Sequence, residues 1–293
     1  SNYINTGDDF VIVEADEYDR SFLELSPDYA VITSIESDHL DVYGDFESLN
    51  KSFELFSKRV KSSLVVEEEI NIKKDYTFSI KNDADYKASN ITTKNEGIIF
   101  DFKTPDSYFT NVFVKIIGMH NLKNVLSALS IIDQIKEIEI SELLPLLSNL
   151  KGIERRMEVY TINEKIIIDD YAHHPTEIES VFDTINNNYK NKSTAVIFQP
   201  HLFSRTRDFM EDFAIVLSKF DEVYLLDIYP AREEPIDGVN SQVLLEKISS
   251  AKKEIISKES INDIVINSNT EVISILGAGN ITENLNKKIF ANE

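Results

Sequence analysis

The sequence predicts an α/β protein with two domains. Short β-branched segments alternate with amphipathic helical segments along most of the chain. Several of these short segments run directly into acidic residues or histidines, as strands do where they end at the ligand-binding edge of an open sheet. The chain has 293 residues, 42% of them hydrophobic, which is enough to bury two cores. We place the domains at residues 1–152 and 153–293.

The composition limits the classes of function. Lys and Arg together number 30 against 51 Asp and Glu, and the formal charge of −21 disfavours nucleic-acid binding. Anionic substrates remain possible where the few basic residues gather. The absence of cysteine excludes disulfides and thiolate chemistry. No segment has the length of a membrane span or the pattern of a signal peptide, so we expect a cytoplasmic protein without a membrane partner.

Two strands are predicted near the N-terminus, and each runs into possible metal ligands. Phe10–Val13 is predicted to be a buried strand that ends at Glu14, and residues 30–35 a second strand followed by His39. Buried strands that end in carboxylates are unusual unless a cation binds there, so Glu14 and His39 are candidate ligands of a divalent metal. The alternative is a solvated acidic loop with a structural histidine.

Helices and strands alternate through the rest of the first domain. We expect helices at residues 45–60, from 118 onward and at 143–150, a strand at 62–67, and short antiparallel strands between 76 and 117. His120, Asn121 and Asn124 lie at the start of the long helix, where side-chain donors and free N–H groups can meet an anion or a purine. Ordinary N-capping by asparagine is the alternative.

Adjacent arginines precede the second domain, in a predicted hinge at residues 151–158. In so acidic a chain, Arg155 and Arg156 are candidates for contacts with phosphate groups. A charge pair on the surface is the alternative.

The second domain is predicted to contain a doubly wound, largely parallel sheet. The expected strands are residues 165–168, 194–198, 223–227 and 271–276, with helices starting at Thr176, ending at Phe220, lying near 241–248 and following Asn280. Gly277-Ala278-Gly279 is expected to be a tight turn, because it is only a fragment of a dinucleotide-binding pattern.

The most informative stretch is Asp169-Asp170-Tyr171-Ala172-His173-His174-Pro175-Thr176-Glu177. It places two of the five histidines, two carboxylates and a tyrosine at the C-terminal end of a strand, where an open sheet binds ligands. His201 and Arg205 likewise follow the strand at 194–198. The alternative is a polar corner between strand and helix, with aspartate caps and a histidine in structural hydrogen bonds.

Seven motifs, in this order and over nearly the whole chain, resemble those of the Mur ligases. They are the run from Glu14, Asp38-His39-Leu40-Asp41, residues 118–124, 152–156, 169–177 and 199–206, and Glu233-Glu234-Pro235. The resemblance implies part of a central ATPase domain, a mixed sheet with added antiparallel strands, followed by a Rossmann-like domain that binds an amino acid. It also implies ATP and Mg²⁺ as cofactors. Within the family, the chain is most similar to the branch that joins L-alanine to UDP-N-acetylmuramate through an acyl phosphate, in peptidoglycan synthesis.

The resemblance further implies roles for individual positions. Glu14 and His39 match magnesium ligands. The positions that match nucleotide contacts are His120, Asn121, Asn124, Arg155, Arg156 and Asp170. The positions that match the amino-acid site, and are the candidate catalytic residues, are Tyr171, His173, His201 and Arg205.

The sequence departs from the family pattern at three places. It has no Gly-x-x-x-x-Gly-Lys-Ser/Thr, so we expect the chain to be the C-terminal portion of a longer enzyme and to be inactive without the N-terminal part that holds this phosphate loop. Leu202 follows His201 where some relatives have arginine, which leaves the amino-acid specificity open. Phe53 stands where other Mur ligases carry a carbamylated lysine, as expected for the alanine-adding branch.

Three alternatives remain at this stage. The ligase that recycles murein peptides shares the Asp-Asp-x-Ala-His-His-Pro-Thr run, although Gln199-Pro200-His201 and Ser204-Arg205-Thr206 favour the alanine-adding branch. A metal-dependent hydrolase would use Glu14, Asp16, His39 and the His173-His174 pair without a nucleotide, but no dense ligand motif supports it. A binding or assembly partner without catalysis is the third.

Overall fold

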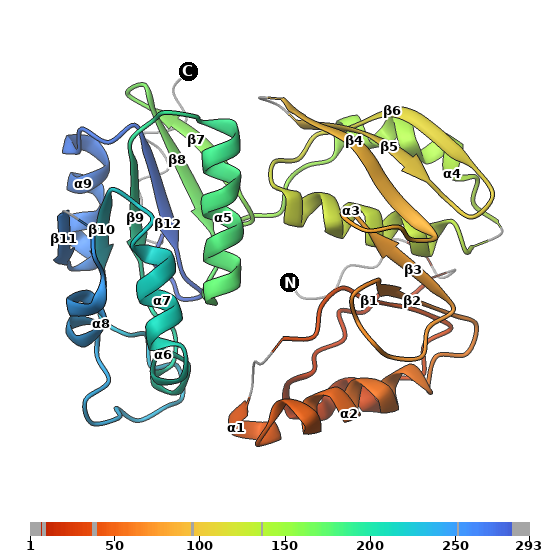
Figure 1. Cartoon of the computed structure of the whole chain (residues 1–293), viewed down its shortest axis with the longest axis horizontal. Coiled ribbons are helices and arrows are strands. Elements are labelled where there is room, and N and C mark those ends of the chain that lie inside the picture. The colour runs from red at the N-terminus through yellow and green to blue at the C-terminus, as the bar shows by residue number, and fades with distance from the viewer. Residues whose placement is uncertain are drawn as a thin grey trace. The chain divides into compact units, whose positions relative to one another are not determined.

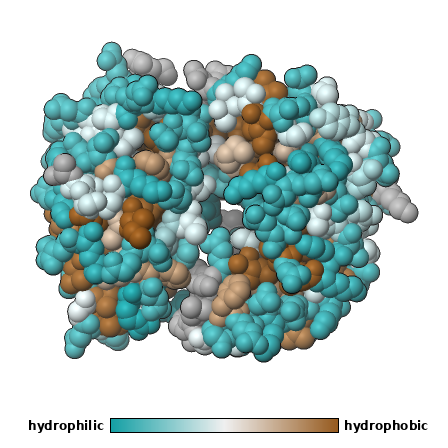
Figure 2. Space-filling view, in the orientation of Figure 1, coloured by the Kyte–Doolittle hydropathy of each residue, from teal (hydrophilic) through white to brown (hydrophobic). Residues whose placement is uncertain are grey.

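The computed structural model describes residues 7, 10–36, 40–94, 97–135, 137–250 and 252–282 (Figure 1). These residues form two six-stranded sheets with associated helices, which confirms the α/β class. The face seen in Figure 2 is largely hydrophilic, as expected for a chain of such high net charge. Within the described ranges, no helix combines the length and the apolar character needed to cross a membrane.

The first sheet has the strand order β1-β2-β3-β4-β5-β6. Its strands are β1 (Tyr29–Ile32), β2 (Ser63–Glu67), β3 (Tyr76–Ser79), β4 (Tyr86–Lys94), β5 (Gly97–Lys103) and β6 (Tyr108–Val114). β1, β2, β3 and β4 pair in parallel, whereas β5 and β6 form an antiparallel pair. The sheet is therefore mixed, as the family resemblance implies.

The prediction of antiparallel strands between residues 76 and 117 is right for the pair β5–β6 and wrong for the pair β3–β4, which is parallel. Val65 of β2 lies beside Tyr76 of β3, and Phe78 of β3 lies beside Tyr86 of β4, both in parallel registers. β3 overlaps only the C-terminal end of β2, and β4 overlaps only the C-terminal end of β3. Short loops are therefore enough to connect these strands. Alternation of polar and apolar residues indicates which side chains are buried, but not the direction of the neighbouring strand.

The strand predicted at Phe10–Val13 does not form. These residues have no regular secondary structure, and their side chains are 56–96% exposed. A strand needs a neighbour to satisfy its backbone hydrogen bonds. Among the described strands, β1 at the edge of the first sheet pairs with β2 alone.

Helix α2 (Phe46–Ser57) begins where the sequence predicts. The Asp45 side chain accepts a hydrogen bond from the backbone N–H of Ser48 at 2.7 Å, which satisfies a donor of the first turn. The other helices of the first half are the 3-10 helix η1 (Tyr18–Glu24), α1 (Leu40–Tyr43), α3 (Met119–Ile132), α4 (Ile140–Leu143) and the 3-10 helix η2 (Leu144–Asn149).

The second sheet has the strand order β11-β10-β9-β12-β8-β7. Its strands are β7 (Glu158–Ile162), β8 (Lys165–Asp170), β9 (Thr194–Phe198), β10 (Glu222–Leu225), β11 (Lys252–Ile255) and β12 (Val272–Leu276). All its pairs are parallel except that of β7 with β8. The predicted largely parallel sheet is confirmed, and β7 and β11 are additional strands that were not predicted.

Helices accompany the strands of this sheet, as the predicted alternation requires. They are α5 (Pro175–Asn188), α6 (Phe203–Asp208), α7 (Met210–Leu217), α8 (Ser241–Lys247), the 3-10 helix η3 (Lys258–Ser260) and α9 (Ile261–Asn267). The helix predicted after Asn280 lies almost entirely outside the described residues.

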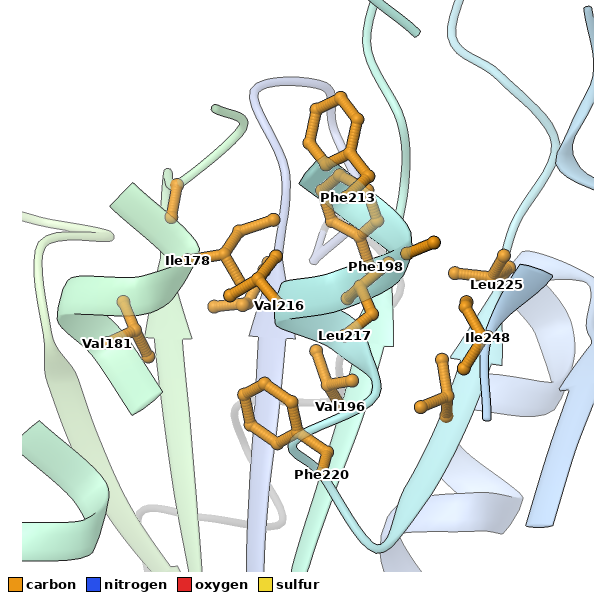
Figure 3. Packing of buried hydrophobic residues seen from close by; sticks show 14 of the residues in the cluster. Ile178, Val181, Val196, Phe198, Phe213, Val216, Leu217, Phe220, Leu225 and Ile248 are labelled. Atoms are coloured by element: carbon orange, nitrogen blue, oxygen red, sulfur yellow. The ribbon is translucent and has the colours of Figure 1, made fainter. Parts of the chain in front are cut away.

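Both faces of the second sheet are buried, because alternate residues of each strand pack in opposite directions. In β9, Val196 and Phe198 belong to the core beneath α5 and α7, whereas Ala195 and Ile197 belong to the core on the other face. Figure 3 shows the first of these cores, where Phe198 lies near Phe213 of α7 with ring centroids 5.4 Å apart.

The chain divides into two compact units. One contains residues up to Lys87 together with Thr104–Asp106 and Leu126–Ile138, and the other contains Ala88–Lys103, Ser107–Val125 and the chain from Glu139 onward. This division differs from a single boundary at residue 152, because most of β4, all of β5 and the first turns of α3 belong to the second unit. The two-domain division at 152/153 stays a prediction.

Candidate functional site

The carboxyl ends of the parallel strands in the second sheet carry the largest group of predicted site residues. β8, β12, β9 and β10 are parallel neighbours, so their C-terminal ends lie along one edge. Asp170 ends β8, and His201, Tyr229 and Gly277 follow β9, β10 and β12. Residues distant in the sequence therefore meet at this edge.

Glu177 fixes the loop between β8 and α5. Its Oε2 accepts the backbone N–H of His173 at 2.8 Å and that of His174 at 3.0 Å. Pro175 occupies the first helical position, where the missing N–H would have had no partner within the helix. The predicted helix start is confirmed to within one residue of Thr176.

His173 lies between Tyr171 and His201. Its ring meets both rings edge-on, with centroids 5.4 Å from Tyr171 and 5.9 Å from His201. The Nδ1 of His173 lies 3.0 Å from the carbonyl oxygen of Tyr171 and 3.3 Å from the Oε2 of Glu177. Both partners are acceptors, so Nδ1 carries a hydrogen.

His201 contacts Arg205 at the start of α6. The Nη1 of Arg205 lies 3.3 Å from the Nδ1 of His201. A guanidinium only donates, so this nitrogen accepts and the neutral imidazole carries its hydrogen on Nε2. Arg205 is 6% exposed, and a cation so shielded from water attracts a carboxylate more strongly than an exposed one.

Leu202 joins His201 to α6 in a strained conformation. Its φ of 70° and ψ of 137° fall where L-residues other than glycine are rarely found. Two hydrogen bonds hold it there: its N–H donates to the carbonyl of Tyr229 at 2.9 Å, and its carbonyl accepts from the Thr206 hydroxyl at 2.8 Å. The loop that presents His201 is therefore rigidly anchored.

Asp170 ties the end of β8 to the turn at residues 154–157. Its carboxylate accepts the N–H of Met157 at 2.7 Å and that of Ala172 at 2.8 Å. Burial raises the pKa of Asp170 despite these hydrogen bonds and the nearby charge of Arg156. These contacts are structural, and a contact with a nucleotide stays a prediction.

The two adjacent arginines have different surroundings. The guanidinium of Arg155 pairs with the fully buried Asp169 at 3.2 Å and donates to the carbonyls of Gly277 at 2.5 Å and Gly279 at 2.8 Å. Arg156 is exposed, and its guanidinium lies 5.3 Å from the centre of the Tyr171 ring. The Arg155 guanidinium is thus held by contacts within the protein, whereas the Arg156 guanidinium lies at the surface.

The start of α3 is partly engaged in internal contacts. The Nδ1 of His120 lies 3.0 Å from the hydroxyl of Ser180, and burial together with the charge of Arg156 lowers the pKa of His120 to about 4. The side chain of Asn121 donates to the carbonyl of Ile117 at 2.8 Å. Asn124 is exposed on the next turn. His120 is therefore a neutral imidazole near pH 7.

The described residues do not assemble the predicted metal site. Glu14 follows the exposed segment Phe10–Val13 and is itself exposed, and His39 lies outside the described residues. Within the described part of the chain, no group of three or more His, Cys, Asp or Glu side chains could hold a metal ion. The assignment of Glu14 and His39 as magnesium ligands stays a prediction.

Three residues of this edge that were not among the predicted site residues support those that were. Asp169 is the buried partner of Arg155, Gly279 accepts from the same arginine, and Tyr229 stacks on His201 with ring centroids 5.5 Å apart. Tyr229 follows the predicted strand at 223–227, and its place after a strand end was the available signal. Its contact with His201 could not be read from the sequence.

Two family descriptions match the chain. Residues 2–132 match the Mur ligase middle domain, and residues 155–279 match the Mur ligase domain described as the glutamate ligase domain. The UDP-N-acetylmuramate–L-alanine ligase of Christiangramia forsetii is 45% identical over 291 residues, which cover 98% of this chain and 64% of that protein. The protein of the same name from Flavobacterium psychrophilum is 42% identical and is covered to 63%. The chain therefore spans less than two thirds of the length of these relatives.

Solved structures show the same fold. The UDP-N-acetylmuramate-alanine ligase MurC from Thermotoga maritima superimposes with a TM-score of 0.72 at 24% identity, over 90% of this chain and 59% of that one. MurF ligase from the same organism, in complex with ADP, gives 0.69 at 20% identity, over 91% and 62%. Since both of its halves match Mur ligase domains in the order that the motifs predict, the chain belongs to the Mur ligase family.

Proposed function

We propose that the chain provides the nucleotide-side and amino-acid-side surfaces of an ATP-dependent ligase that joins L-alanine to UDP-N-acetylmuramate. The observation that carries the proposal is the gathering of Tyr171, His173, His201 and Arg205 at one edge of the second sheet, near the exposed Arg156. The 45% identity to a relative of that name supports the choice of substrates.

In this proposal, ATP donates its γ-phosphoryl group to the muramoyl carboxylate, and the amine of L-alanine then attacks the acyl phosphate. Arg205 is assigned to the carboxylate of the amino acid, because its buried charge is close to His201. His173 and His201 form the walls beside it. Their edge-on contact keeps the two rings in a fixed relation, which orients the bound amine.

Of the two adjacent arginines, Arg156 is assigned to the phosphate groups. The Arg155 guanidinium pairs with the buried Asp169 and donates to two backbone carbonyls, so turning it to a ligand would leave Asp169 without its cation. Arg156 is exposed and can reorient without such a loss.

Catalysis is proposed to require the part of the relatives' length that this chain does not cover. The sequence has no glycine-rich phosphate loop, and the backbone donors and lysine of such a loop hold ATP in line for attack. Mg²⁺, with Glu14 and His39 as ligands, and a cytoplasmic location belong to the same proposal.

The test compares the 293-residue chain with a fusion that adds the part of the Christiangramia forsetii relative that this chain does not cover. Calorimetry should detect no binding of ATP and magnesium to the chain alone, and assays of phosphate release should detect no turnover. The fusion should release phosphate only when UDP-N-acetylmuramate and L-alanine are both present. Micromolar ATP binding or turnover by the chain alone would contradict the proposed requirement for the added part.

A panel of acceptors decides between the related activities. L-Alanine, L-serine, glycine and the tripeptide used by the recycling ligase are compared in the fusion. Preference for the tripeptide would overturn the choice of L-alanine, and hydrolysis with metal but no nucleotide would favour a hydrolase. Arg205→Ala should raise the KM for the amino acid and leave that for ATP unchanged, whereas Arg156→Ala should do the reverse.

A further inference from the structure

Tyr229 holds the loop of His201 through both its backbone and its ring. Its N–H donates to the carbonyl of Pro200 at 2.8 Å, and its carbonyl accepts from the N–H of Leu202 at 2.9 Å, so the two residues flanking His201 are both bonded to it. The phenol ring stacks on the imidazole with centroids 5.5 Å apart and an interplanar angle of 14°. The Tyr229 ring therefore lies nearly parallel to the His201 ring and offset from it.

The Tyr229 ring rests in turn on Gly279. A Cβ at position 279 would lie 3.3 Å from two carbons of this ring and 2.9 Å from the Oε1 of Gln199, closer than real Cβ atoms approach without displacing their neighbours. Gln199 is 5% exposed and has little room to move. Glycine at this position therefore lets the ring approach the backbone closely.

Gly279 is itself fixed by Arg155. Its carbonyl accepts from Nη1 of Arg155 at 2.8 Å, and the same guanidinium pairs with the fully buried Asp169. A continuous set of contacts thus runs from the arginine turn through Gly279 and Tyr229 to His201. His201 in turn contacts Arg205 and His173.

We propose that Tyr229 and Gly279 are positioning residues for His201. The stacked phenol fixes the plane of the imidazole, and Gly279 fixes the phenol. The plane matters because the Nδ1 of His201 must stay within reach of Arg205, which the proposed function assigns to the amino-acid carboxylate. The contacts also link the amino-acid side of the edge to the turn that carries Arg156. This inference rests on the proposed function only for the role of His201 in the amino-acid site. The contacts that hold its ring are observed independently of that role.

The first test measures the geometry without any reaction. The full chain, labelled at the ε1 carbon of histidine, contains only five such signals, and His201→Gln assigns the one of interest. The ring current of a neighbouring aromatic side chain shifts the signals of the protons beside it. Tyr229→Leu should therefore shift the His201 signal, whereas Tyr229→Phe, which keeps the ring, should leave it in place.

Gly279→Ala provides an independent variant, because it keeps Tyr229 but pushes on its ring. It should move the His201 signal, whereas the control Gly152→Ala, whose Cβ would meet nothing within 4 Å, should not. Circular dichroism and the remaining histidine signals show whether Tyr229→Leu folds. If it does not, the His201 signal of Gly279→Ala tests the proposal. An unchanged His201 signal in a folded Tyr229→Leu or Gly279→Ala protein overturns the proposal.

The second test reads out the consequence in the fusion described above. Tyr229→Leu should raise the KM for the amino acid roughly two- to tenfold, the range expected for loss of one aromatic pair, with the KM for ATP unchanged. Tyr229→Phe should restore it. An unchanged KM for the amino acid overturns the positioning role. If the unsubstituted fusion shows no turnover, the proposed function fails while the histidine signals still decide the geometry.

Discussion

At the scale of single residues, the adjacent arginines Arg155 and Arg156 differ in burial and in the groups that they contact. Arg155 bridges a buried carboxylate and two backbone carbonyls, whereas Arg156 lies on the surface beside Tyr171. A buried cation cannot be removed without stranding the charge that it neutralises. An exposed cation can be removed with little effect on the fold.

Arg155→Ala should therefore lower the free energy of unfolding by about 3 kcal/mol, the scale of breaking a buried ion pair from one side. The matched control is Arg156→Ala, which should change it by no more than ~0.5 kcal/mol. Urea unfolding followed by tyrosine fluorescence measures both. Equal effects of the two substitutions would mean that the pair with Asp169 does not contribute as the geometry suggests.

The lowered pKa of His120 makes stability depend on pH. Its ordinary value of 6.5 falls to about 4 in the folded chain, chiefly through burial. Below about pH 6.5 the unfolded chain binds a proton on this imidazole that the folded chain does not, so the free energy of unfolding should fall as the pH drops toward 4. His120→Gln should flatten this dependence in urea titrations between pH 7 and pH 4. A slope identical to that of the unsubstituted chain would contradict it.

At the scale of secondary-structure elements, α7 shows how one helix divides its residues between core and solvent. Phe213 is fully buried against Phe198, whereas Ile215, two residues later, is 65% exposed. Residues two apart on a helix point in different directions, so the same element offers a core position and a surface position.

Phe213→Ala should lower the free energy of unfolding by roughly 3–5 kcal/mol, because it removes a large side chain from a packed core and leaves a cavity. Ile215→Ala on the same helix should change it by less than ~1 kcal/mol, because its side chain is largely in water. Thermal unfolding monitored by circular dichroism compares them. A large loss from Ile215→Ala would reveal a contact that the exposed position does not show.

At the scale of the whole molecule, the second sheet should fold independently of the first. Its two cores consist of buried residues between Met157 and Ile281, with helices on both faces. A fragment of residues 153–293 should therefore give one cooperative unfolding transition in urea. A fragment that lacks such a transition would show that residues before 153 complete this fold.

The exposed segment Phe10–Val13 should promote self-association. Four consecutive apolar side chains lie in water, and the edge strand β1 pairs with β2 alone among the described strands. Such features template contacts between copies. Val11→Lys with Ile12→Lys should reduce concentration-dependent association in sedimentation velocity. Ile153→Lys, an apolar residue 72% exposed elsewhere, is the control and should not reduce it.

The sequence by itself determined the α/β class, the largely parallel second sheet and, to within two residues, the strand ends that precede Tyr171 and His201. Periodicity and turn residues act locally, so a single sequence records which side chains face a core and where a strand stops. The roles of these residues toward substrates, by contrast, came from the resemblance to the Mur ligases.

Only the tertiary structure decided the parallel direction of β3 and β4, the exposure of Phe10–Val13, and the commitment of Arg155 to Asp169. It alone placed Tyr229 on His201 and Gly279 beneath Tyr229. Each of these depends on a partner distant in the sequence. Strand pairing and side-chain contacts are chosen by the packing of the whole fold, and no local pattern contains that choice.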